Sequence, residues 1–256
     1  GVYYIHNEQG NLIYVGKSRN MKKRVNQHFT GITTKCKKIQ NEVFAVTYDE
    51  TGSELIALLK ESQEIKINKP KFNVAQRKNH FAVGLYHEKD ENGYINLKLQ
   101  KNDGRKKEIT SFINLKEGTD ALERIIEYYQ LCPKLAGLNI ATSDCYKFQI
   151  KKCDGACLGK IPAEEYNQRV QAFIDKNSFE NQNMVLIDRG RNISEHSAVL
   201  IENGNYKGYC FYDLNYQIHN LEILKNIIVP MENNRDVKNI IQSYIRKSKS
   251  LKIIKF

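Results

Sequence analysis

The sequence has no tryptophan, only four prolines and no long apolar run. No segment approaches the ~20 apolar residues that a helix needs to cross a bilayer, so we expect no membrane association. No signal peptide, internal repeat, low-complexity tract or long Gly/Pro/Ser linker is recognisable. A chain of 256 residues can instead form one large domain or several small modules with real hydrophobic cores. Because it starts at Gly1 without a methionine, we expect a fragment of a longer protein.

Acidic residues are outnumbered, 29 against 40 Lys and Arg, which leaves a net charge of +11. Residues 1–80 carry 14 basic and 7 acidic residues, so much of the excess lies at the amino-terminal end. A basic surface favours a polyanionic partner, most simply nucleic acid. The alternative is a lysine-rich and asparagine-rich proteome that makes many of its proteins basic.

Six cysteines are present, and four of them fall in one segment with the spacing C-x12-C-x7-C-x3-C. This clustering favours a metal site in a reducing compartment, the cytoplasm, over a disulfide framework. The C-x3-C pair differs from the C-x2-C knuckle of structural zinc, and all-cysteine ligation also suits an iron–sulfur cluster. An iron–sulfur cluster, zinc and metal-free thiols therefore all stay open. The four are Cys132, Cys145, Cys153 and Cys157, whereas Cys36 and Cys210 are isolated.

Residues 1–78 predict a small α+β domain. Two strand-forming runs, Val2–Ile5 and Leu12–Val15, flank a polar turn and indicate a β-hairpin. A basic helix over Asn20–Phe29 and a third strand over Glu42–Tyr48 follow. Thr51-Gly-Ser-Glu54 matches a capping box and opens a helix that runs to about Ile67. The expected fold is a three-stranded antiparallel sheet flanked by helices.

Three further segments follow, 79–130, 131–178 and 179–256. The first predicts a connecting hairpin, Phe81–Tyr86 with Tyr94–Leu99, and an amphipathic helix over Thr119–Gln130. The second holds the cysteines and a helix over Ala163–Asp175. The third predicts a small α+β module without a catalytic constellation. Its elements are strands Met184–Ile187, Ser197–Ile201, Tyr206–Tyr212 and Leu251–Phe256, and a helix over Arg235–Arg246.

Glu61 is an unusual residue for its place in the predicted second helix. Ala57, Leu58 and Ile65 lie three or four positions away, so the carboxylate sits on the apolar stripe. A carboxylate there is costly unless it is paired or binds a metal. A buried salt bridge and an exposed stripe edge are the structural alternatives.

The hairpin resembles the signature of the GIY-YIG nucleases. Gly1-Val-Tyr3 stands for its first half and Tyr14-Val-Gly16 for its second. The other motif positions follow in order and are Lys17, Arg24, His28, Glu61 and Asn73. The family cuts DNA phosphodiesters with one divalent metal, so the resemblance implies Mg²⁺ or Mn²⁺ at Glu61.

The resemblance also implies roles for the other motif residues. Tyr3 or Tyr14 would activate water, although a free phenol with a pKa of about 10 needs a nearby cation or a proton acceptor to do so. Lys17, Arg24 and His28 would hold the phosphate or polarise the activator. Asn73 would be structural or hydrogen-bond the substrate. Tyr4, adjacent to Tyr3, points to the opposite face of the strand.

The cysteine segment is similar to that of the UvrC/Cho family of nucleotide-excision-repair endonucleases. Tyr146–Ile150, Cys153, Cys157 and Glu165-Tyr166 carry the likeness, while Ala156 replaces a common proline. The family implies a four-iron cluster, DNA as substrate and partners of the UvrB type. We expect the likeness to end near residue 175. Because the rest of the chain is too short for the second nuclease of UvrC, we expect one incision chemistry rather than two.

Three alternatives accompany this interpretation. One is a catalytically silent nucleic-acid-binding module with a structural metal. Another is a homing-type or restriction-type GIY-YIG enzyme. The third is the nuclease part of bacterial fusion proteins that carry an exonuclease like DNA polymerase III epsilon ahead of the GIY-YIG unit.

Overall fold

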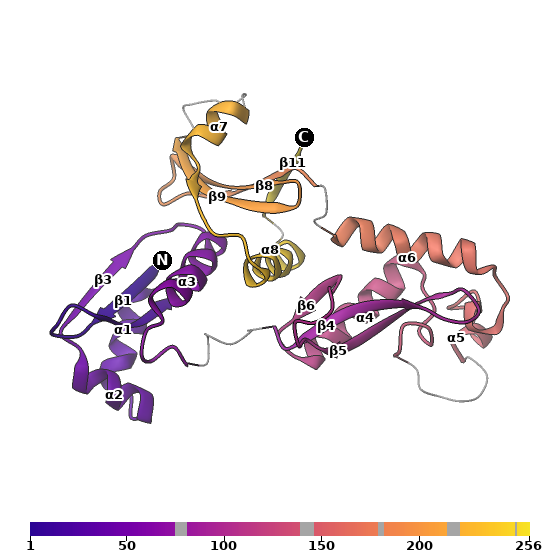
Figure 1. Ribbon diagram of the computed structural model, residues 1–256, viewed down its shortest axis with the longest axis horizontal. Coiled ribbons are helices and arrows are strands. Elements are labelled where there is room, and N and C mark those ends of the chain that lie inside the picture. Colours follow the sequence, from indigo (N-terminus) through magenta and orange to yellow (C-terminus); the bar gives the residue numbers. More distant parts are fainter. Residues whose placement is uncertain (75–80, 139–145, 179–181, 214–220, 249) are drawn as a thin grey trace. The chain divides into compact units, whose positions relative to one another are not determined.

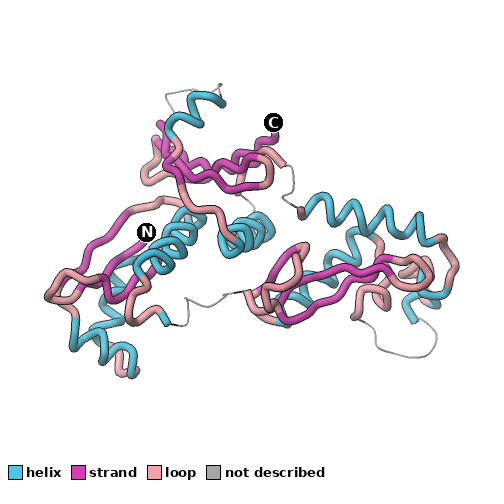
Figure 2. Tube along the Cα trace, viewed as in Figure 1, coloured by secondary structure: helices cyan, strands magenta, loops and turns pink. Residues whose placement is uncertain are grey.

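The computed structural model describes residues 1–74, 81–138, 146–178, 182–213, 221–248 and 250–256 (Figures 1 and 2). Its contacts group into two compact units. The first joins Gly1–Asn79 with Glu180–Phe256, and the second is His80–Phe179. No helix in the described part of the chain has both the length and the apolar character needed to span a membrane.

The first unit begins with the predicted antiparallel sheet, in the order β2-β1-β3. Its strands are β1 (Val2–His6), β2 (Leu12–Lys17) and β3 (Ala45–Asp49). Helices α1 (Met21–Thr30) and α3 (Glu54–Asn68) confirm the two that the sequence predicted. Helix α2 (Thr34–Glu42) was not predicted, because Ile39 is its one buried side chain and leaves no apolar period to detect.

The two faces of this sheet pack differently. Tyr3, Ile5 and Tyr14 form one apolar cluster with Ile39 of α2. On the other face, Val2 and Val15 pack against residues of α3. The Tyr4 hydroxyl donates to Asp49 Oδ2 at 2.9 Å, which confirms that Tyr4 and Tyr3 point in opposite directions.

The start of α3 corrects one detail of the prediction. Ser53, rather than Thr51, is the N-cap, because its side chain accepts a hydrogen bond from the Leu55 N–H at 3.1 Å. The Thr51 hydroxyl turns instead to the Ser53 carbonyl oxygen, at 3.1 Å. The helix therefore begins at Glu54, two residues later than a capping box at Thr51 would place it.

The carboxyl-terminal part of the first unit is an antiparallel sheet in the order β10-β9-β8-β7-β11. Helix α8 (Arg235–Lys247) packs against α3 (Figure 1). The predicted strands and this helix are present, whereas α7 and β10 were not predicted. The remaining bounds are β7 (Met184–Arg189), β8 (Glu195–Glu202), β9 (Asn205–Asp213), α7 (Leu221–Ile227), β10 (Val229–Pro230) and β11 (Lys252–Lys255).

The second unit pairs a β5-β4-β6 sheet with helices around one core that contains Leu85, Phe112, Tyr166 and Phe173. Helix α4 begins earlier than predicted because Asn114 caps it. The elements are β4 (Val83–Lys89), β5 (Ile95–Lys101), β6 (Thr110–Phe112), α4 (Leu115–Tyr129), α5 (Tyr146–Gln149), the 3₁₀ turn η2 (Ala156–Leu158) and α6 (Ala163–Asn177).

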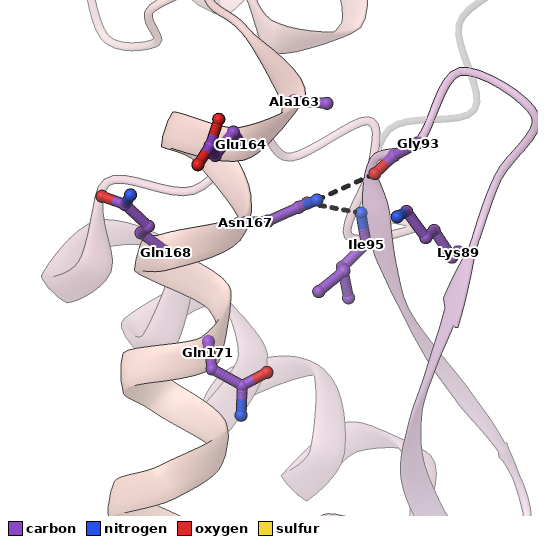
Figure 3. A pocket seen from close by; sticks show the side chains of 8 residues that line it. All are labelled: Lys89, Gly93, Ile95, Ala163, Glu164, Asn167, Gln168 and Gln171. Atoms are coloured by element: carbon purple, nitrogen blue, oxygen red, sulfur yellow. Dashed lines mark hydrogen bonds between the residues drawn. The ribbon is translucent and has the colours of Figure 1, made fainter.

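A shallow cleft lies between α6 and the β4–β5 hairpin of this unit (Figure 3). Asn167 crosses it, accepting from the Ile95 N–H and donating to the Gly93 carbonyl, both at 2.8 Å. The cleft is lined further by Lys89, Glu164 and two glutamines. Its central amide serves to fasten the hairpin to the helix.

Candidate active site

Two tyrosines stand on one face of the β1–β2 hairpin. Tyr3 pairs with Gly16 across the strands, and Tyr14 pairs with Ile5, so the two rings are diagonal neighbours. Their centroids are 6.0 Å apart. A Cβ atom on Gly16 would overlap the Tyr3 hydroxyl and the Tyr14 ring. Glycine is therefore required there to let both phenols lie across the strand.

His28 closes this group from α1. Its Nε2 lies 2.8 Å from the Tyr3 hydroxyl, and its ring stands edge-on to Tyr14 at 4.9 Å between centroids. Only 5% of His28 is exposed. Burial, with the charges of Arg24 and Lys35, lowers the pKa of His28 to about 4. The imidazole is thus neutral at pH 7, and its Nε2 can accept a hydrogen bond from the Tyr3 hydroxyl.

Two cations flank the phenols. Arg24 lies one helical turn before His28, and its charge lowers the pKa of Tyr3 and of Tyr14, although burial raises both more strongly. The Arg24 guanidinium also donates to Gln27 Oε1 at 3.0 Å. Lys35 Nζ lies 4.2 Å from the centre of the Tyr14 ring, a cation–π contact. Lys35 belongs to α2, so the missed helix also hid this residue from the sequence analysis.

Glu61 points toward the same group of residues. Its Oε1 accepts a hydrogen bond from the Lys17 backbone N–H at 3.2 Å, at the end of β2. Burial raises the pKa of Glu61, against the lowering effect of Lys17, Lys35 and Arg24. The Glu61 charge in turn raises the pKa of Tyr14. The carboxylate thus lies in a basic, partly buried environment rather than in bulk solvent.

Lys17 takes part in a way that its motif position does not reveal. Its ammonium group pairs with Glu54 Oε1 at 3.2 Å, and Arg19 contacts the other oxygen of the same carboxylate at 2.8 Å. Glu54 is therefore an addition to the predicted set. In this arrangement the backbone of Lys17, rather than its side chain, contacts Glu61.

Asn73 lies 1% exposed beneath β2. Its Oδ1 accepts from the Val15 N–H at 2.9 Å, and its Nδ2 donates to the Val15 carbonyl at 2.8 Å. Strand β2 is an edge strand, so this amide takes the place of a neighbouring strand. The arrangement corresponds to the structural alternative for Asn73.

The structure therefore brings six predicted residues into one region: Tyr3, Tyr14, Arg24, His28, Glu61 and the backbone of Lys17. Within the described residues, no three His, Cys, Asp or Glu side chains form a group that could hold a metal. A cation at Glu61 would thus rely on one carboxylate, with water and substrate oxygens as further ligands. That donor set suits a hard divalent ion.

The structure describes three of the four cysteines predicted to bind a metal. Cys132 is buried in the core of the second unit, and Cys153 and Cys157 pack against that core. Burial raises the pKa of the buried Tyr166, and charge on each of the three thiols raises it further, which places all three near this tyrosine. Cys145 lies outside the described residues. The three described cysteines share one neighbourhood but do not by themselves form a metal-binding group.

Comparison with known proteins divides the chain in a similar way. A UvrC-like GIY-YIG domain matches residues 1–74, and the UvrC/Cho excinuclease middle domain matches residues 83–176. The UvrABC system protein C of Alkaliphilus oremlandii (strain OhILAs) is 31% identical over 194 residues, which are 68% of this chain and 29% of the relative. That of Methylococcus capsulatus (strain ATCC 33009 / NCIMB 11132 / Bath) is 30% identical over 208 residues, 79% of this chain and 33% of the relative.

A third relative extends the likeness further than the sequence analysis expected. The UvrABC system protein C of Coxiella burnetii (strain Dugway 5J108-111) is 29% identical over 255 residues, 95% of this chain and 40% of the relative. That coverage includes most of residues 180–256, so the expected end of the likeness near residue 175 was wrong. The chain spans less than half the length of these relatives. The exonuclease fusion is not tested by these matches and stays a prediction.

Proposed function

Since the chain belongs to the UvrC-like branch of the GIY-YIG nuclease superfamily, we propose that it is a DNA-repair endonuclease that hydrolyses phosphodiester bonds with a divalent cation at Glu61. The observation that carries the proposal is the convergence of Glu61, the two phenols, His28 and Arg24 around the β1–β2 hairpin. Hydrolysis needs a water activator, positive charge at the phosphate and stabilisation of the leaving oxygen. This group of side chains can supply the first two.

Proton transfer runs through Tyr3 in this proposal. A water O–H proton passes to the Tyr3 oxygen while the Tyr3 hydroxyl proton passes to His28 Nε2, 2.8 Å away. The water oxygen bonds to phosphorus, the bond from phosphorus to the leaving oxygen breaks, that oxygen takes a proton from solvent, and His28 releases its proton to solvent. This relay avoids a free phenolate, which burial disfavours, and the low pKa of His28 means that the imidazolium is transient and gives up its proton readily.

Charge at the phosphate comes from the surrounding cations. Arg24 suits a bidentate contact with phosphate oxygens. Lys35 is directed at Tyr14 and adds positive charge on the same side. A Mg²⁺ or Mn²⁺ ion bound at Glu61 would supply Lewis-acid stabilisation of the scissile phosphate and the leaving oxygen. The raised pKa of Glu61 means that this carboxyl must lose its proton before it can hold the ion.

A path for the DNA backbone is offered by the outer side of α1. A shallow groove there is lined by Lys22, Lys23, Asn26 and Phe29, on the helix that also carries Arg24 and His28. Lysines and asparagine can contact phosphates, and an exposed aromatic ring can stack on a base or sugar. Binding through this groove would be sequence-tolerant and would weaken as salt rises.

The middle domain and its cysteines carry a second proposal. The four thiols would hold a metal centre, either a four-iron cluster or zinc, and this centre would take no part in the cleavage step. The three described thiols gather around Tyr166, which is consistent with one centre. The relatives are named as parts of a UvrABC system, so a UvrB-type partner is proposed for this chain as well.

Nicking of supercoiled plasmid tests the endonuclease proposal. With Mg²⁺ the protein should convert supercoiled DNA to open circles, and Glu61→Ala should reduce the rate by at least about 100-fold. Glu64→Ala is the matched control, because Glu64 lies on the same helix and its carboxylate accepts a hydrogen bond from the exposed amide of Asn68 at 2.9 Å. Equal nicking by Glu61→Ala and the parent protein, or DNA binding without any cleavage, would contradict the proposal.

A further inference from the structure

Helix α3 is buried on two opposite sides. Ala57 and Ile65 face the three-stranded sheet, on the side of the helix that also carries Glu61. Leu55 and Leu59 point the other way and are 1% and 0% exposed. A helix with apolar residues on both sides needs a second covering layer. That layer contains α8, against which α3 packs.

The amino-terminal end of α3 is fastened to the carboxyl-terminal sheet. The hydroxyls of Ser53 and Tyr244 both donate to Asp188 Oδ2, each at 2.7 Å. Ser53 is the N-cap of α3, Asp188 belongs to β7 and Tyr244 to α8. The backbones also touch, because a Cβ atom on Gly52 would overlap the Gly190 carbonyl. One carboxylate therefore joins three elements beside the helix cap.

The last turn of α3 is held by a separate set of contacts. Lys66 Nζ forms an ion pair with Asp236 Oδ2 at 2.6 Å and donates to Asn234 Oδ1 at 2.7 Å. Asn234 is the N-cap of α8 and Asp236 lies in its first turn. Both side chains of the ion pair are partly buried, 29% and 22% exposed, so solvent screens it less than a surface pair.

We propose that β7 and α8 of the carboxyl-terminal module, with the Asn234 cap, form a clamp that holds α3 at both ends and thereby fixes where Glu61 meets the end of β2. Asp188 and Asp236 are its positioning residues. Glu61 lies between the two anchor points, eight residues after Ser53 and five before Lys66. Its hydrogen bond to the Lys17 N–H depends on the depth of the helix against the sheet. The catalytic part of this inference depends on the proposed function, whereas the clamp itself does not.

Hydrogen exchange of the metal-free protein tests the clamp. Asp188→Ala and Lys66→Met, alone and together, should speed exchange of the amides of Glu54–Asn68 by at least about tenfold in the double variant. Lys225→Met is the matched control, because it removes an ion pair to Glu202 made within the carboxyl-terminal module. Tyr244→Phe is a milder variant that removes one hydroxyl and keeps the ring, and it should show a smaller increase.

A second readout tests the positioning of Glu61. The Mg²⁺ concentration for half-maximal nicking should rise about fivefold or more in the double variant, because a small displacement of a catalytic group is costly. Unchanged exchange in α3 would overturn the clamp. Faster exchange with an unchanged Mg²⁺ requirement would overturn the positioning role. If the parent protein does not nick DNA, the proposed function fails while the exchange experiment still decides the clamp.

Discussion

The hairpin site and the cysteine segment differ in how their candidate residues come together. The hairpin site is assembled from residues scattered over Tyr3–Glu61, yet each reaches another by a contact of defined geometry. The described cysteines are closer in sequence, yet they pack as core residues without a recognisable set of ligands. Closeness in sequence therefore says less about a reactive site than buried charge and unusual pKa values do.

The largest effect is expected from removing the hydroxyl of Tyr3. Tyr3→Phe should lower the nicking rate by about 10²–10⁴-fold, the usual contribution of a general base, and leave DNA binding intact. Tyr4→Phe is the control, since its hydroxyl serves Asp49 on the opposite face. A nicking rate for Tyr3→Phe close to that of Tyr4→Phe would move the water activator to Tyr14 or away from the phenols.

The free energy of unfolding should fall at low pH because of His28 in the hairpin site. Its folded pKa of about 4 lies below the unfolded value of 6.5, so the unfolded state binds the extra proton first. The contribution of His28 to the free energy of unfolding is fully present above pH 6.5 and is lost as the pH falls toward 4. The loss is at most about 3 kcal/mol.

Urea unfolding at several pH values can isolate this contribution. His28→Asn should remove the extra loss of stability between pH 6.5 and 4, whereas His6→Gln should retain it, because His6 lies at an exposed hydrogen-bonding position. A parent protein with the same pH profile as His28→Asn would mean that His28 is solvated and cannot act as a neutral acceptor for Tyr3.

Much of the hairpin site was accessible from the sequence because its parts obey local rules. Alternation predicted that Tyr3 and Tyr4 point apart, and helical spacing placed Glu61 on a buried side of α3. Lys35 was missed because α2 has a single buried residue and no apolar period. The Glu54 ion pairs with Lys17 and Arg19 were missed because a contact across 35 or more residues leaves no local pattern.

The second covering of α3 shows the same limit at a larger scale. Leu55 and Leu59 were visible as apolar residues, but nothing local shows that α8, more than 170 residues away, packs against the helix that carries them. Similarly, the capping-box pattern matched Thr51, whereas the N-cap is Ser53, whose hydroxyl donates to Asp188, 135 residues away. Long-range packing overrides short motifs where both can be satisfied in more than one way.

A smaller effect should follow from Asn73→Ala. The change leaves the Val15 N–H and carbonyl without the amide that serves them, which should cost about 2 kcal/mol in the free energy of unfolding. Asn68→Ala, an exposed amide on the last turn of α3, should stay within about 0.5 kcal/mol of the parent. Loss of nicking without loss of stability in Asn73→Ala would instead favour a substrate contact.

The smallest effect on cleavage is expected from the cysteines. Cys153→Ser and Cys157→Ser should abolish bound iron or zinc, measured by metal analysis and by visible absorbance of anaerobically purified protein. Cys36→Ser is the control, because its thiol lies near the Gln27 carbonyl in the other unit. Nicking should change by less than about fivefold, equivalent to roughly 1 kcal/mol in the barrier, because these thiols supply no group to the hairpin site.

A 100-fold loss of nicking in Cys153→Ser, with Cys36→Ser unaffected, would mean that the middle domain controls cleavage. If the parent protein contains no metal and nicks DNA normally, the four cysteines are ordinary thiols. The hairpin site would then be a reactive centre and the cysteine segment a purely structural one.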